Sequence, residues 1–120
     1  MTELDLVRLW MRAFSLTLVV ELAVATPLFR PVEASLARRS GIVAIAQLTT
    51  HPIVWFVLPA LHLPRGAFLT VAEVWAVLGE TFVYRLALTR AALGRVLLVS
   101  ALSNVASFAV GTVFRSALGG

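Results

Sequence analysis

The sequence predicts an all-α integral membrane protein, a compact bundle of four transmembrane helices with short loops. Of the 120 residues, 60% are hydrophobic and only 13% are charged, whereas soluble domains are about half apolar and about a quarter charged. The mean hydropathy is +0.95. The apolar residues also lie in runs long enough to cross a bilayer, for which about 20 residues are needed. The length therefore accommodates four spans in a single transmembrane domain, residues 1–120.

The four predicted spans are separated by arginines and turn-forming residues. They cover residues 10–29, 41–63, 67–88 and 92–114. The second span contains no charged residue, but Pro52 and Pro59 favour kinks within it. Residues 30–40 are predicted to lie along the membrane surface as one or two helical turns. Pro-Arg-Gly at residues 64–66 is a turn signal, which makes the second and third spans an antiparallel hairpin.

The basic residues predict the environment of the chain and its orientation. All ten are arginine, and they gather at the ends of the spans, where a membrane protein meets lipid phosphates. The lipid bilayer is therefore the expected partner, and nucleic acid is not. Most of the arginines flank the first and third loops, so the positive-inside rule places both termini in the periplasm. Arginine in place of lysine also suggests a GC-rich genome, and hence a multi-pass protein of the bacterial inner membrane.

A signal peptide is the alternative interpretation of the first span. Ala23-Val24-Ala25 has the form of a signal-peptidase site after an apolar run, and cleavage there would remove the span. Glu3 and Asp5 do not fit the positive start of a signal peptide. We therefore expect the first span to be retained, with cleavage left open.

Polar side chains occur at similar depths in all four spans. At a rise of about 1.5 Å per residue, Glu21, His51 and Asn104 lie near the centres of the first, second and fourth spans. Glu73 and Glu80 lie on either side of the centre of the third span. They are seven residues apart, so they lie on one face of the helix. These positions predict a polar column through the middle of the bundle.

Further polar residues extend this column. Gln47 and Ser100 share the predicted level of Glu80, and Tyr84 lies one turn nearer to the arginine-rich side. One face of the fourth span carries Ser100, Asn104, Ser107 and Gly111. Small residues on such a face let membrane helices approach closely, so we expect this face to point inward.

The cost of burying charge makes this column the candidate site. A charged side chain at the centre of a membrane helix costs about 2.5–3.5 kcal/mol, and no arginine lies at the depth of the glutamates. We therefore expect at least one of the carboxyl groups to be protonated near neutral pH. The predicted proton- or cation-handling residues are Glu21, His51, Glu73 and Glu80. The predicted supporting network is Gln47, Tyr84, Ser100, Asn104 and Ser107.

The function expected from this site is transport or conduction of protons, cations or a small cationic solute. Four spans enclose little volume, so a pathway would require a homo-oligomer. The alternative is a non-catalytic accessory or assembly subunit of a larger membrane complex, in which the polar face docks a helix of a membrane protein partner. In that case the polar residues fix the packing of the helices.

Enzymatic activity is not expected. The sequence has no HExxH, GxSxG or phosphate-binding glycine loop. An intramembrane hydrolase stays open because Ser100 or Ser107 could meet His51 and Glu80. The absence of cysteine excludes disulfides and thiolate chemistry. The Glu-x-x-His pattern of helical di-metal sites is also missing, so no metal or other cofactor is predicted.

Overall fold

The computed structural model describes residues 2–117, which form four α-helices and one short 3-10 helix, without strands in that range. The elements are α1 (Glu3–Leu28), α2 (Leu36–Phe56), η1 (Leu58–Leu61), α3 (Arg65–Ala87) and α4 (Leu93–Ala117). Four helical stretches, with α2 and η1 counted together, are long and apolar enough to cross a membrane. The prediction of an all-helical, four-helix protein is confirmed, and the fold is compatible with a multi-pass membrane protein.

The second helix differs from its predicted bounds. It begins at Leu36 rather than at residue 41, because the Ser35 hydroxyl accepts a hydrogen bond from the Arg38 backbone N–H and caps the helix. Part of the predicted surface stretch is thus the first turn of α2. The helix ends at Phe56 and gives way to η1, since Pro59 has no N–H to continue the α-helical pattern.

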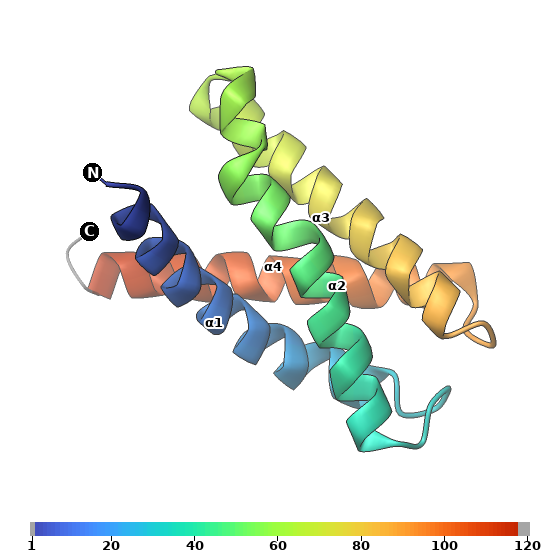
Figure 1. Ribbon diagram of the computed structural model, residues 1–120. Coiled ribbons are helices and arrows are strands. Elements are labelled where there is room, and N and C mark those ends of the chain that lie inside the picture. Colours follow the sequence, from blue (N-terminus) through green and yellow to red (C-terminus); the bar gives the residue numbers. More distant parts are fainter. Residues whose placement is uncertain (1, 118–120) are drawn as a thin grey trace.

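The four helices form a ring in which each packs against two neighbours. Helix α1 contacts α2 and α4, and α3 likewise contacts α2 and α4. Figure 1 shows that the pair of α1 and α4 and the pair of α2 and α3 converge at one end and diverge toward the other. The N-terminal end of α1 lies near the C-terminal end of α4 (Figure 1). The longest dimension is 44 Å, close to the full thickness of a bilayer, which is about 40–45 Å with its headgroups.

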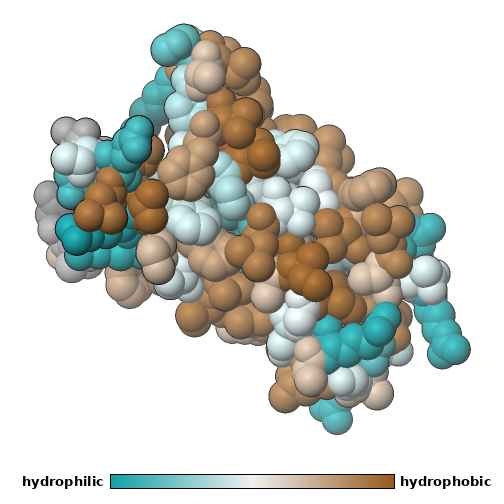
Figure 2. Space-filling model, viewed as in Figure 1, coloured by the Kyte–Doolittle hydropathy of each residue, from teal (hydrophilic) through white to brown (hydrophobic). Residues whose placement is uncertain are grey.

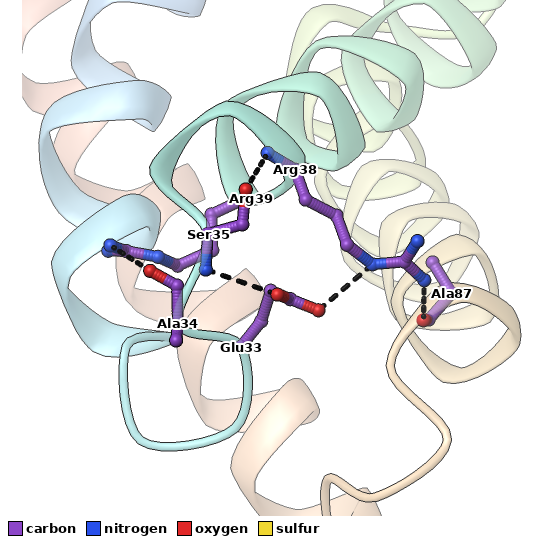
Figure 3. Close-up of polar contacts among 6 residues, drawn as sticks. All are labelled: Glu33, Ala34, Ser35, Arg38, Arg39 and Ala87. Carbon is purple, nitrogen blue, oxygen red and sulfur yellow. Dashed lines mark hydrogen bonds and ion pairs between the residues drawn. The ribbon is translucent and has the colours of Figure 1, made fainter.

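The convergent end, here called the arginine end, is held by Arg38, Arg39, Arg85 and Arg95. Arg38 pairs with Glu33 at 2.9 Å and also donates to the Ala87 carbonyl at 3.3 Å, as Figure 3 shows. Arg39 donates to the Thr26 carbonyl at 2.7 Å.

The other two arginines of this end bind loop and helix-end carbonyls. Arg85 donates to the Ala91 carbonyl at 2.6 Å, and Arg95 donates to the Leu28 carbonyl at 3.2 Å. Leu28 is the last residue of α1, where helical carbonyls lack partners within the helix and carry partial negative charge. Arginines therefore join the ends of different helices through backbone oxygens.

The outer surface is apolar along the helices. Val19, Phe82 and Leu86 are each more than 60% exposed. Figure 2 shows hydrophobic residues over the middle of the molecule and hydrophilic residues gathered at its ends. Exposed apolar surface on this scale is unusual for a soluble monomer, and it fits helices surrounded by lipid.

Helices α2 and α3 approach closely at Gly79. A Cβ atom at this position would lie 2.7 Å from the Thr50 Cγ2 methyl group, so a larger residue would require Thr50 or the helices to shift. About one helical turn before Gly79, the Trp75 indole N–H donates to the Thr50 carbonyl at 3.1 Å. Such a glycine contact brings two helix backbones together, as is common in membrane bundles, and it sets the spacing across which Gln47 reaches Glu80.

Candidate functional site

Glu80 lies at the centre of the bundle and is fully buried on α3. Its Oε1 accepts a hydrogen bond from the Gln47 amide of α2, and its Oε2 accepts one from the Asn104 amide of α4. The Ser100 hydroxyl, also on α4, lies 3.3 Å from Oε2. Three helices therefore meet at one carboxyl group, and the level shared by Gln47, Glu80 and Ser100 is the one that their spacing in the sequence predicts.

The Ser100 hydroxyl has a choice of acceptors. Its Oγ lies 3.3 Å from Glu80 Oε2 and 3.1 Å from the Val77 carbonyl oxygen. A hydroxyl has one proton to donate and two lone pairs that accept. Ser100 can therefore donate to a Glu80 carboxylate, or donate to the Val77 carbonyl while it accepts a proton from Glu80.

Glu21, on α1, is the second fully buried carboxyl group. The Ser107 hydroxyl lies 3.3 Å from Glu21 Oε1 and 3.1 Å from the Asn104 carbonyl oxygen. Glu21 Oε2 has no hydrogen-bond partner within residues 2–117. The arrangement at Glu21 thus repeats that at Glu80, with a serine hydroxyl placed between a carboxyl group and a backbone carbonyl.

Asn104 connects the two carboxyl groups. Its side-chain amide donates to Glu80 and, at 2.8 Å, to the Ser100 carbonyl, while its backbone carbonyl accepts a hydrogen bond from the Ser107 hydroxyl. The spacing of Ser100, Asn104 and Ser107 places them on one face of α4. We call Glu21, Gln47, Glu80, Ser100, Asn104 and Ser107 the carboxyl core, to which all four helices contribute.

The carboxyl core contains no basic side chain. The ion pair between Arg38 and Glu33 is the only salt bridge in the described residues, and it lies at the arginine end. Nor does that part of the chain hold three or more histidine or acidic side chains close enough together to bind a metal ion. Neutral amides and hydroxyls are therefore the hydrogen-bond partners of Glu21 and Glu80.

His51 lies apart from the carboxyl core. Its Nδ1 accepts a hydrogen bond of 3.0 Å from the Trp10 indole N–H, and its ring lies 5.5 Å from Phe14 and 6.4 Å from Trp55 between ring centres. The structure thus places His51 in an aromatic cluster between α1 and α2. The sequence predicted His51 beside the glutamates because it was expected at their depth. Depth along a span does not specify which neighbouring helix a side chain faces.

Glu73 is half-buried and separate from the hydrogen bonds around Glu80. It lines a groove of about 610 Å³ between α3 and α4, whose other walls are mostly apolar. Asn104 lines the same groove. The two glutamates of α3 therefore share a helix face but not an environment, because Glu80 is covered by α2 and α4.

Tyr84 contributes an aromatic ring to the core of the arginine end. The ring packs edge-on against Phe29 at 4.8 Å between centres, and the hydroxyl has no hydrogen-bond partner among the described residues. The structure thus gives Tyr84 a packing role and no hydrogen bond to the carboxyl core.

Five polar residues outside the predicted site are also buried: Thr26, Arg39, Thr50, Thr81 and Ser103. Arg39 is 8% exposed, although it lies in the stretch predicted to be interfacial. Ser103 is fully buried and donates to the Val99 carbonyl at 2.5 Å. Its position in a run of small residues on α4 is the signal that indicates burial; nothing in the sequence distinguishes Arg39 from its neighbour Arg38.

The chain was compared with protein-family models, curated proteins and solved structures, and none of the three comparisons found a match.

Proposed function

We propose that this chain is an integral membrane protein that moves protons or cations, in exchange for or together with a small cationic solute. The observation that carries the proposal is the pairing of each buried carboxyl group with a serine hydroxyl that also reaches a backbone carbonyl. At Glu80, where amides also donate to the carboxyl group, such a pair satisfies its hydrogen bonds in both charge states.

The chemistry at Glu80 follows from its donors. When Glu80 is ionised, the Gln47 and Asn104 amides and the Ser100 hydroxyl supply three hydrogen bonds to it. When Glu80 is protonated, its O–H donates to Ser100 Oγ, whose own proton turns to the Val77 carbonyl. No buried donor is left unpaired by this rearrangement, which keeps its free-energy cost low.

Glu21 supplies a second exchangeable group. Its Oε1 has the Ser107 hydroxyl as a partner, and its Oε2 is unpaired within the described range. The hydrogen bonds through Asn104 and Ser107 connect it to Glu80. Both carboxyl groups thus contact the same stretch of α4, and this proximity supports coupling between a proton or cation at one of them and the charge of the other.

The membrane setting rests on the four apolar helices and on the arginines. With the arginine end facing the cytoplasm, the positive-inside rule places both termini in the periplasm of a bacterial inner membrane. The four helices of one chain pack as a ring closed by side chains, so we propose that the pathway forms in a homo-oligomer.

Flux through proteoliposomes tests the proposal. The purified protein should dissipate a pH gradient or take up a cation in response to one, and Glu80→Gln should abolish this flux. Glu33→Gln is the matched control, because Glu33 lies at the arginine end, and it should leave flux unchanged. Absence of flux in the wild-type protein, together with co-purification of a membrane protein partner, would favour an accessory subunit instead.

A further inference from the structure

We propose that the groove between α3 and α4 binds an amphipathic amine, with the ammonium group held between Glu73 and Asn104. The inference rests on the proposed function and names the class of its solute. The groove has a volume of about 610 Å³, enough for a small aromatic or alkyl amine.

The polar groups of the groove are hydrogen-bond acceptors. Glu73 forms no hydrogen bond or ion pair with another described residue, although it is half-buried. The Asn104 amide nitrogen donates to Glu80 and to the Ser100 carbonyl. This orientation leaves Asn104 Oδ1, which no described group contacts by a hydrogen bond, as the free end of the amide.

Thr70 does not change this balance. It also lines the groove, but its hydroxyl donates to the Gly66 carbonyl at 3.0 Å within α3, so its proton is already in use. A carboxylate and an amide oxygen facing one space attract a ligand with a positive charge and N–H donors. An anion or a neutral apolar molecule would leave these acceptors unpaired.

The remaining walls select an apolar body for the ligand. They include Leu78 and Val105, which are 58% and 66% exposed, and Phe108, which is 43% exposed. Because these side chains are open to the surroundings, the groove is accessible from the side of the bundle. In a membrane this side faces lipid, so an amine dissolved in the bilayer reaches Glu73 without crossing the core.

The groove is also connected to the carboxyl core. Asn104 lines the groove, and its amide nitrogen donates to Glu80 and to the Ser100 carbonyl. An ammonium group bound to Asn104 Oδ1 would polarise the same amide group whose N–H stabilises an ionised Glu80. Binding of the amine is thereby coupled to the proton on Glu80, which supplies a physical link for exchange of one for the other.

Calorimetry with the protein in lipid nanodiscs tests the site, with a phenylpropyl ammonium ion as the probe and empty nanodiscs subtracted. Saturable binding is expected. Glu73→Gln should weaken it about tenfold or more, because a charge-assisted hydrogen bond is lost. Glu33→Gln serves as the matched control and should bind like the wild type. Phenylpropanol, of similar shape but uncharged, should not bind saturably.

A second variant covers the case in which Glu73→Gln fails to fold. Ala101 lines the groove, and Ala101→Phe fills it without removing a carboxylate, so it should also abolish binding. Binding that is unchanged in both variants, or equal for the alcohol, would overturn the proposal and indicate that lipid fills the groove. So would disulfide cross-linking of two copies through Val105→Cys in this cysteine-free chain, since a second copy would then cover the groove.

The two proposals can fail separately. Amine binding that depends on Glu73 but is accompanied by no flux in proteoliposomes would contradict the transport function and leave the groove site standing. Flux that depends on Glu80, with amine binding indifferent to Glu73→Gln, would contradict the groove site alone.

Discussion

The arginine end and the carboxyl core differ in the groups that bind their ionisable side chains. At the arginine end, Arg38, Arg39, Arg85 and Arg95 donate to backbone carbonyls at 2.6–3.4 Å. In the carboxyl core, the two buried glutamates accept hydrogen bonds from amides and hydroxyls, with no arginine or histidine among their partners. The two buried glutamates are thus kept apart from the arginines, and the ion pair of the arginine end involves Glu33 instead.

This separation has a consequence for function. A guanidinium is charged at any pH that a protein meets, so the arginines of the arginine end remain hydrogen-bond donors regardless of pH. A carboxylate paired with an arginine would likewise stay ionised. Glu21 and Glu80 lack such a partner, and at Glu80 the neutral donors accommodate either charge state. The arginine end is therefore suited to hold the helices together, and the core is suited to exchange protons or cations.

The largest effect is expected when the core loses its central acceptor. Glu80→Leu removes the acceptor of the Gln47 amide and one of the two acceptors of the Asn104 amide, which keeps the Ser100 carbonyl. We expect the free energy of unfolding to fall by about 2–4 kcal/mol, measured by titration with sodium dodecyl sulfate in mixed micelles. Glu73→Leu is the matched control, and it should cost less than about 1 kcal/mol because Glu73 has no such donors. Equal costs for the two variants would contradict the central role of Glu80.

A smaller effect is expected at the arginine end, where two neighbouring residues can be compared. Arg39 is buried and donates to the Thr26 carbonyl at 2.7 Å, so Arg39→Ala should cost about 1–3 kcal/mol in the same unfolding assay. The side chain of Arg38 is 58% exposed, and Arg38→Ala should cost about 0–1 kcal/mol, since exposed ion pairs contribute little. A larger loss at Arg38 than at Arg39 would show that burial is not what matters here.

Helix spacing predicted much of this arrangement from the sequence. Hydropathy located four helices, and residue spacing placed Gln47, Glu80 and Ser100 at one level, where hydrogen bonds now join two of them to the third. The break at Pro59 follows from its missing N–H, but an apolar run gives no sign of how completely the helix will end there. Helix ends are therefore less well predicted than helix cores.

What could not be predicted depends on the rotation of each helix and on its neighbours. His51 faces Trp10 and Phe14, and Glu73 faces a groove rather than the core. Both placements depend on which helices are adjacent, and spacing along one helix does not contain that information. The burial of Arg39 likewise depends on the loop that folds over it, where it reaches the Ala34 carbonyl at 3.4 Å (Figure 3).

The most direct test of the account is infrared spectroscopy of the carboxyl groups as a function of pH, with the protein reconstituted in lipid. If Glu80 exchanges a proton, the spectrum should contain a carboxylic-acid C=O band that changes reversibly with pH, is shifted by exchange into D₂O and loses intensity in Glu80→Gln. Ser100→Ala should alter the frequency of the band without removing it, because one hydrogen-bond partner of Glu80 is lost. A band that does not respond to pH, or that is the same in Glu80→Gln, would contradict proton exchange at the carboxyl core.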